Sequence, residues 1–270
     1  MRKRFGQMLR IGVSRHGLAL VKTRRWGAAA PEVLGQLVFG AADMPGYEGM
    51  AAGVRRLLLD TGCARWQASV VLADDLVRMW QVAPPPGAAR LADLEAAAAL
   101  RFRTLFGDNP AAWTMAAGWN ASQPFLAAAM PRQLLALLEQ TAREQQVDLV
   151  AIAPQFVAGW NQWRHALKPG AWYAQVQQRV LTMGVVEGRA LSTVRAAALP
   201  DGASLDWLGQ HVAREALRLN VAAPVRIAIA GSAPLAWNSS AGDLACTLLA
   251  PGQGADWPDA VRLALTGSRA

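Results

Sequence analysis

The order of strand-like and helix-like runs repeats once along the chain, and this repetition limits the folds that the sequence can adopt. The first copy comprises predicted strands at 9–15, 17–25 and 32–40, a helix at 47–62 and a strand at 66–73. The second comprises predicted strands at 171–178, 179–188 and 189–199, a helix at 205–220 and a strand at 225–231. A three-stranded meander joined to a parallel strand through a helix gives a mixed sheet with helices on its faces. We therefore predict an α/β protein with two mixed-sheet lobes.

An additional module separates the two copies. The predicted elements here are a strand at 76–86 that ends in three prolines, an amphipathic helix at 90–107 and a hairpin at 112–119 and 124–130. We expect them to form an inserted strand-helix-hairpin module at about 76–130. A helix at 131–146, opened by a proline, and a buried strand at 147–153 complete the first lobe. A strand at 244–250 and a helix at 258–267 complete the second, so the lobes are expected to span 1–153 and 154–270.

The composition is that of a globular protein. Hydrophobic residues make up 53% of the 270 residues, and charged residues make up 17%. No uninterrupted apolar run approaches the roughly 18 residues of a membrane-spanning helix, and the basic start lacks the apolar segment of a signal peptide. Cys63 and Cys246 lie in apolar surroundings, which favours two buried reduced thiols. These features predict a cytoplasmic protein.

The net charge is +8, from 27 Lys and Arg against 19 Asp and Glu. The positive charges cluster only near the N-terminus, at 2–4 and 22–25. Such a start can be a solvated basic edge, or it can be attracted to an anionic membrane at about 1 kcal/mol per basic residue. No basic stripe interleaved with aromatic residues is present, so no specific nucleic acid is expected.

The stretch RIGVSRHGLALVKT at 10–23 predicts two strands joined by a tight turn at 14–17. Gly17 supplies the permissive backbone that such a turn needs. Some proteins hold a phosphate in a turn of this kind, with an acidic residue and glycines between the strands. The acidic residue is missing here, so the turn can be a phosphate loop, a degenerate phosphate loop or only a hairpin.

Several landmarks occur in the order and spacing of a known fold. They are LRIGVSRHGLALVK, LVRMWQVAPPP before ADLEAAAALRF, PRQLLALLEQTAREQQVDLVAIAP, VVEGRALSTVRAA, VRIAIAG and AVRLALTG. With the inserted module, this order resembles the actin-like ATPase fold, a duplicated ribonuclease H-like fold. More narrowly, it resembles the PilM family of type IV pilus assembly proteins and the related cytoplasmic domains of type II secretion and mannose-sensitive pilus assembly proteins. The resemblance covers essentially the whole chain.

The resemblance implies a nucleotide pocket of which only remnants are left. Actin-like ATPases carry an Asp in each of two phosphate hairpins and a Gly-Gly on the adenosine side. The matching positions here are Ser14, Arg15, His16, Gly17, Lys22, Gln177, Gly231 and Ser232. Because Mg²⁺ needs oxygen ligands and these turns offer no carboxylate, we expect no enzymatic activity, no metal and no cofactor. Binding of ATP with Mg²⁺ belongs to an alternative in which the ATPase works, and Arg15 with Lys22 could still hold an anion without metal.

The same resemblance implies a non-enzymatic scaffold, cytoplasmic and peripheral to the inner membrane, in a type IV pilus or type II secretion-like assembly complex. Its partner would be a bitopic inner-membrane protein whose cytoplasmic N-terminal segment lies in a groove near Val77, Met79 and Trp80. Homo-oligomerisation is a further possibility. The alternatives are a nucleotide-binding ATPase of the same machinery and a basic nucleic-acid-binding module.

The remaining candidate residues point to no chemistry of their own. The three histidines lie far apart, without a partner at the spacing of metal ligands. Asp74-Asp75 is interpreted as a solvated turn. Most of the 11 tryptophans are expected in the core, and some as exposed anchors for a partner.

Overall fold

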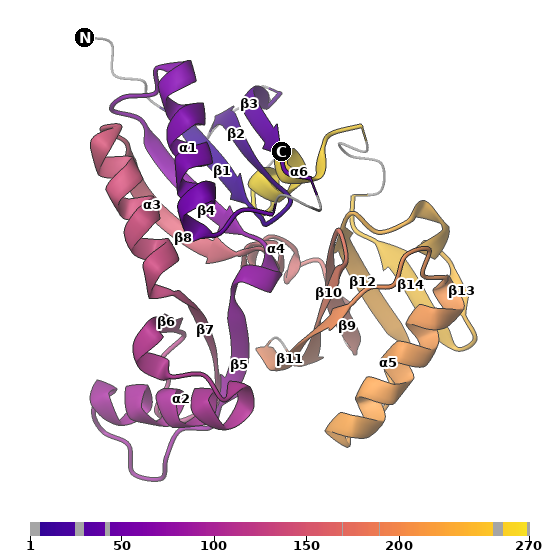
Figure 1. Ribbon diagram of the computed structural model, residues 1–270. Helices are drawn as coiled ribbons and strands as arrows, with labels where there is room; N and C mark the ends of the chain where they lie inside the picture. The colour runs from indigo at the N-terminus through magenta and orange to yellow at the C-terminus, as the bar shows by residue number, and fades with distance from the viewer. Residues whose placement is uncertain are drawn as a thin grey trace.

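The computed structural model describes residues 6–24, 30–40, 44–168, 170–188, 190–250 and 256–268. Two lobes lie side by side, and a smaller module extends from the first lobe (Figure 1). Each lobe is built on one mixed sheet, and the module on a three-stranded sheet. The duplicated order of elements that the sequence predicts is thereby confirmed.

The first lobe has a five-stranded sheet in the order β3-β2-β1-β4-β8. Its elements are β1 (Gln7–Val13), β2 (Gly17–Arg24), β3 (Glu32–Val38), α1 (Tyr47–Thr61), β4 (Gln67–Leu72), α3 (Arg132–Glu144) and β8 (Asp148–Pro154). The meander β1-β2-β3 is antiparallel, and β4 joins β1 in parallel. Helices α1 and α3 cover one face of this sheet (Figure 1).

Helix α1 illustrates how local sequence sets these elements. Its apolar residues recur at helical spacing, so that Met50, Val54 and Leu57 are buried in the core of the first lobe. Gly62 follows with φ 60° and ends the helix in the left-handed conformation that glycine adopts at little cost. The predicted boundaries of 47–62 are therefore correct to one residue.

The second lobe has a six-stranded sheet in the order β11-β10-β9-β12-β14-β13. Its elements are β9 (Ala171–Gln177), β10 (Val180–Glu187), β11 (Ala190–Ala198), α5 (Leu205–Leu219), β12 (Arg226–Gly231), β13 (Ser240–Ala241) and β14 (Leu244–Leu248). Helix α4 (Gln155–Trp163) links the lobes and contacts β4 and β8 of the first lobe and β9 of the second.

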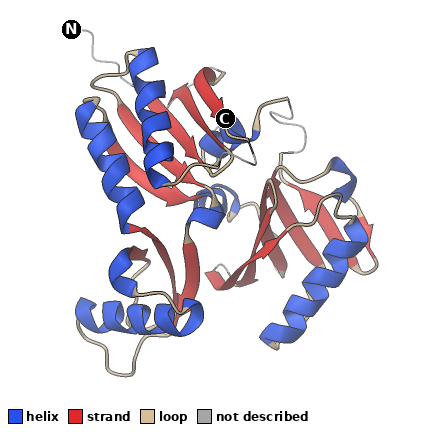
Figure 2. Cartoon of the chain, viewed as in Figure 1, coloured by secondary structure: helices blue, strands red, loops and turns tan. Residues whose placement is uncertain are grey.

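The inserted module has the predicted strand-helix-hairpin order. It consists of β5 (Arg78–Val82), α2 (Leu91–Phe106), β6 (Trp113–Ala117) and β7 (Phe125–Pro131), with β7 between β5 and β6 (Figure 2). Its core holds Trp80, Phe102 and Phe125. The predicted strand at 76–86 is shorter than expected, because a 3₁₀ turn, Asp74–Leu76, precedes β5.

The last helix, α6 (Asp259–Leu265), lies on the first lobe, which corrects the expectation that it completes the second lobe. It packs against β1 and β2, where Ala260, Val261 and Ala264 meet Ala19 and Val21. The helix therefore covers the sheet face opposite α1 and α3 (Figure 1). The chain crosses between the lobes twice, through α4 and again before α6.

Strand β8 is also corrected. It is an edge strand of the five-stranded sheet, and Asp148, Val150 and Ala151 are exposed. Its apolar sequence, VDLVAIA, predicts a buried strand. The composition of a short apolar run does not distinguish the centre of a sheet from its edge.

The seat of α6 on β1 generates a test of the fold. A Cβ atom on Gly12 would lie 2.4 Å from the carbonyl oxygen of Ala260 and 2.8 Å from the backbone nitrogen of Ala264. Because both atoms are backbone, Gly12→Ala must displace α6, and we expect a loss of about 1–3 kcal/mol in the free energy of unfolding by urea. Gly118→Ala is the matched control, since its Cβ would meet no atom within 4 Å. Equal urea midpoints for Gly12→Ala and wild type would contradict this packing.

Candidate functional site

The turn between β1 and β2 is held by the hydroxyl of its own serine. Ser14 is 1% exposed, and its Oγ accepts hydrogen bonds from the backbone N–H groups of His16 (3.3 Å) and Gly17 (3.0 Å). The same hydroxyl donates to the carbonyl oxygen of Gly17 at 2.9 Å. Backbone N–H groups are what such a turn would offer to a phosphate. Ser14 therefore occupies the donors that an anion would need.

The two basic residues of the predicted remnant have acidic partners. Arg15 Nε lies 3.6 Å from a carboxylate oxygen of Asp75. Lys22 Nζ lies 2.7 Å from Glu32, and it stands well along β2, opposite Leu9 rather than at the turn. The structure thus leaves Arg15 beside Ser14, His16 and Gly17 and separates Lys22 from them.

The second hairpin, between β9 and β10, uses Gln177 to bind other parts of the protein. Gln177 is 4% exposed, and its Oε1 accepts a hydrogen bond from Gln155 Nε2 at 3.1 Å. Its Nε2 donates to the carbonyl oxygen of Asp259 at 3.2 Å. Gln155 begins α4 and Asp259 begins α6. One side chain therefore joins the second lobe to both connections between the lobes.

The third remnant, at the end of β12, is packed against the same hairpin. Ser232 N donates to the carbonyl oxygen of Val176 at 2.9 Å, and Gln178 N donates to Ser232 Oγ at 3.3 Å. Gly231 has φ 90°, and a Cβ there would lie 2.0 Å from the carbonyl oxygen of Val176. Gly231 is thus required for a close approach between strands. The second and third remnants come together, and they bind each other.

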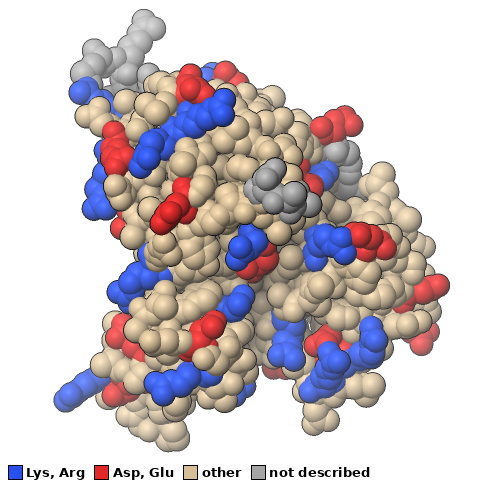
Figure 3. Space-filling model, viewed as in Figure 1, with Lys and Arg blue, Asp and Glu red and all other residues tan. Residues whose placement is uncertain are grey.

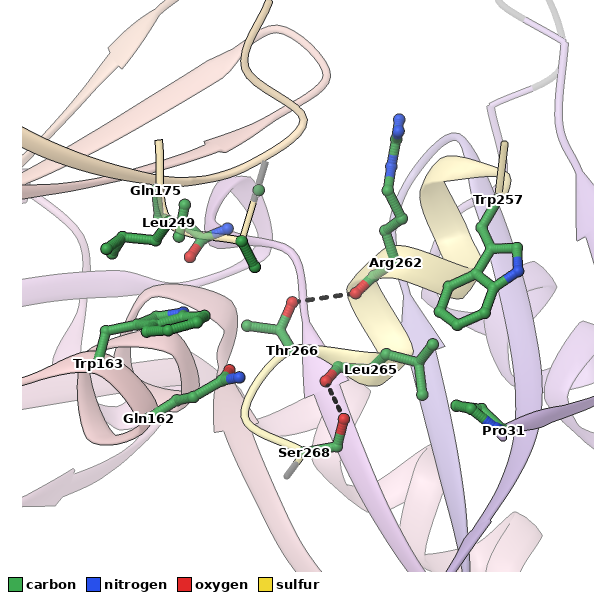
Figure 4. A pocket seen from close by; sticks show the side chains of 13 residues that line it. Pro31, Gln162, Trp163, Gln175, Leu249, Trp257, Arg262, Leu265, Thr266 and Ser268 are labelled. Carbon is green, nitrogen blue, oxygen red and sulfur yellow. Dashed lines mark hydrogen bonds between the residues drawn. The ribbon is translucent and has the colours of Figure 1, made fainter. Parts of the chain in front are cut away.

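A small cavity remains between α4, α6 and the carboxyl ends of β12 and β14. Figure 4 shows Trp163 and Gln175 on one side of it, and Leu265 and Trp257 on the side of α6. Its volume is about 150 Å³, below the roughly 300–1,000 Å³ of a typical ligand pocket. Gly231 is a remnant residue that lines it, and no carboxylate is among its described lining residues.

Across the described ranges, no group of three or more His, Cys, Asp and Glu residues could hold a metal ion.

Asp74 corrects the interpretation of Asp74-Asp75 as a solvated turn. It is 4% exposed rather than solvated, and its Oδ1 accepts a hydrogen bond of 2.9 Å from Phe156 N in the first turn of α4. Burial raises the pKa of Asp74 to about 7, against the N–H of Phe156, which lowers it. The charge of Asp75 raises the pKa further, and the hydroxyl group of Thr182, from β10, lowers it. Asp74 therefore joins the end of β4 to α4 at the junction of the lobes.

The residues predicted to contact a partner are largely internal. Val77 and Trp80 are 3% and 2% exposed, and Trp80 packs edge-on against Phe102 with ring centroids 5.2 Å apart. Met79 is half-buried and packs against the junction of the lobes. The expectation that Val77 and Trp80 contact a partner is therefore corrected, because both side chains are buried, while a groove near them stays a prediction. A tryptophan in a strand has the same sequence signature whether it faces a core or a partner.

The free edge of the module is β6, which the sequence analysis did not single out. On the other side of its sheet, β5 faces β11, and Gln81 Nε2 donates to the carbonyl oxygen of Leu191 at 3.1 Å. Gly118 N donates to the carbonyl oxygen of Leu126, so the antiparallel pattern directs the N–H and C=O groups of Met115 and Ala117 away from β7. Within the described residues, no second strand pairs with β6. These groups are available for an added strand.

The remaining predictions can be placed as follows. Cys63 and Cys246 are buried free thiols, as expected. The basic residues Arg2, Lys3, Arg4 and Arg25 lie outside the described residues. No helix in the described part of the chain is both long and apolar enough to cross a membrane.

Comparison with known proteins shows the fold. No family model and no curated protein matches the chain. Among solved structures, the chain is similar to the PilM-PilN complex of type IV pilus biogenesis, with a TM-score of 0.65, 14% identity and 98% of each chain covered. It is also similar to a Bacteroides thetaiotaomicron protein of actin-like ATPase fold and unknown function, with a TM-score of 0.64, 10% identity and 91% of each chain covered. A third similar structure is the cytoplasmic domain of EpsL, an inner membrane component of the type II secretion system of Vibrio cholerae. Its TM-score is 0.57 at 12% identity, and the match covers 97% of this chain and 94% of that one. The chain has the actin-like ATPase fold.

The burial of Asp74 predicts a pH dependence of stability. A carboxyl group whose pKa is higher in the folded than in the unfolded state binds more protons when folded, so its burial costs stability as the pH rises from about 4 to about 7. Asn at this position keeps the acceptor for Phe156 N and cannot ionise. We expect Asp74→Asn to be more stable than wild type at pH 8, by a few kcal/mol at most, and the difference to shrink at pH 5. Urea unfolding at both values measures it, and a difference that does not change with pH would contradict the assignment.

Proposed function

We propose that this protein is a non-enzymatic assembly scaffold of a type IV pilus or type II secretion-like complex, acting at the cytoplasmic face of the inner membrane. The observation that carries the proposal is that the positions of the nucleotide pocket in this fold are occupied by contacts within the protein. Ser14 fills its own turn, and Gln177 binds α4 and α6. The solved structures of a PilM-PilN complex and of an EpsL cytoplasmic domain, which share the fold, support the choice of machinery.

We also base the proposal on the groups that hydrolysis of a nucleotide would require. Transfer of a phosphoryl group depends on a metal ion and on positioned groups that orient water. Asp74 and Asp75, which follow β4 beside the first turn, are engaged with Phe156 N and Arg15. Asp259, at the start of α6, is paired with Arg262. We therefore propose that the two lobes keep one fixed relation instead of opening and closing around a nucleotide.

A scaffold needs a surface that a partner can recognise, and we propose the edge of β6 for this role. An extended cytoplasmic segment of a membrane protein could add a strand beside Met115 and Ala117, with main-chain hydrogen bonds supplying affinity. The half-buried side chains of Trp113, Thr114 and Met115 give this edge a mixed polar and apolar character. The alternation of side chains along the added strand would supply specificity.

The proposal predicts that ATP with Mg²⁺ leaves the thermal unfolding temperature unchanged. A ligand of the folded state adds about 2.7 kcal/mol of stability at 100 times its Kd, which a thermal scan detects. We expect no rise in the unfolding temperature because the N–H groups of His16 and Gly17 are already bonded to Ser14. A rise in the unfolding temperature that disappears when EDTA removes the Mg²⁺ would contradict the non-enzymatic scaffold.

A second prediction concerns the edge of β6. Ala117→Pro removes an outward N–H group and places a ring against any added strand, while the bonds to β7 remain. Val38→Pro is the matched control, because Val38 lies on the free edge of β3, is 76% exposed and also directs its N–H outward. A tagged chain purified from detergent-solubilised membranes of its natural host should bring a single-span membrane protein with it. We expect Ala117→Pro to lower that yield about tenfold or more, and Val38→Pro to leave it unchanged.

The detergent removes any contribution of the lipid surface from this measurement. Thermal unfolding of both variants checks that each is folded. Full retention of the membrane protein by a folded Ala117→Pro variant would exclude the β6 edge as the contact.

A further inference from the structure

The outer face of α5 combines exposed arginines with the most exposed large apolar side chain among the described residues. Leu217 is 80% exposed, and it lies between Arg214 and Arg218, which are also exposed. Ala213 continues this face one turn earlier. A surface helix normally turns its leucines toward the core. Leu217 is therefore a feature that the packing of the second lobe does not explain.

The arginines of this face are held in place by a buried acid. Glu215 is 5% exposed, and its two carboxylate oxygens bind different partners. Arg218 Nη1 lies 2.6 Å from Oε1, and Arg195 Nε, from β11, lies 3.5 Å from Oε2. The two arginine side chains remain 65% and 49% exposed, while the acid that orders them is withdrawn from the surface. Two guanidinium groups are thus presented side by side to solvent.

A guanidinium group recognises phosphate through paired N–H donors, and ordering it beforehand reduces the entropy lost on binding. The net charge of this face is +2, from the three arginines Arg195, Arg214 and Arg218 and the one acid Glu215. Figure 3 shows Lys and Arg side chains gathered over this end of α5.

We propose that the face formed by Arg195, Arg214, Leu217 and Arg218 docks on an anionic lipid surface. The arginines would bind lipid phosphates, and Leu217 would enter the headgroup region, as apolar residues of interfacial helices do. A nucleic-acid backbone would use the charge but would leave Leu217 without an apolar partner, which is why the lipid surface is favoured. The inference rests on the proposed function, because that function places the protein beside a membrane.

The position of this face agrees with the proposed partner edge. The C-terminal end of α5 lies on the same side of the molecule as the inserted module (Figure 1). A protein docked through α5 would therefore turn the module that carries β6 toward the membrane from which a partner segment emerges.

Co-sedimentation with lipid vesicles tests the proposal on the full chain. The probes are vesicles of phosphatidylglycerol mixed with phosphatidylcholine, and vesicles of phosphatidylcholine alone. Wild type should bind the mixed vesicles and not the neutral ones. Each charge near the surface contributes about fivefold, so Arg214→Glu with Leu217→Ser should weaken binding to mixed vesicles by about tenfold or more.

The matched control carries the same changes at the same spacing on α1, Arg56→Glu with Leu59→Ser. Arg56 has a side chain 71% exposed, and Leu59 is 61% exposed. This control alters net charge equally and should keep binding within about twofold of wild type, because the docking face is intact. Equal losses in both double variants, equal binding to neutral vesicles or no binding to either vesicle would overturn the proposal.

Duplex DNA serves as a competing probe. The lipid proposal would be overturned if wild type bound DNA but not vesicles, and if the Arg214→Glu with Leu217→Ser variant lost the binding to DNA. That result would assign this face to nucleic acid. The vesicles contain no protein partner, so failure here leaves the β6 contact standing. Likewise, failure of co-purification through β6 leaves vesicle binding standing.

Discussion

The buried hydrogen bonds of Gln177 hold the arrangement of the two lobes. Gln177 lies at the tip of the β9–β10 hairpin and reaches the first residues of α4 and α6, the two segments that pass between the lobes. Arg10 adds a second tie, because its guanidinium group donates to the carbonyl oxygens of Ala264 and Thr266 at the end of α6. Buried polar groups are costly unless they are paired, so these side chains tolerate few other arrangements.

This arrangement is the basis of the proposed scaffold function. In the first turn, the Ser14 hydroxyl accepts hydrogen bonds from the backbone N–H groups of His16 and Gly17. At the second hairpin, the side-chain amide of Gln177 bonds to α4 and α6, and Gly231 brings the end of β12 against that same hairpin. We propose that these internal bonds replace the contacts of a bound nucleotide. Two outer surfaces, the edge of β6 and the outer face of α5, are left uncovered by other elements of the described structure.

The sequence predicted those features that depend on neighbouring residues. The three-strand meanders, α1 with its terminal Gly62, and the β6–β7 hairpin follow from periodicity and turn chemistry within one segment. The errors concern contacts between distant segments. Asp74 looked solvated because the N–H group that covers it belongs to Phe156, and α6 was assigned to the wrong lobe because its seat at Gly12 lies near the other end of the chain. Trp80 and Leu217 show the same limit, since a large apolar residue gives no sign in sequence of whether it is buried or exposed.

Hydrogen exchange at the backbone N–H groups of His16 and Gly17 tests the central claim most directly. Both groups donate to Ser14 Oγ, so the account predicts slow exchange in the free protein and the same rates after addition of ATP and Mg²⁺. Nuclear magnetic resonance of the uniformly labelled chain follows each group separately. Fast exchange in the free protein that becomes slow with ATP and Mg²⁺ would show that the turn is open to a phosphate, and would contradict the account.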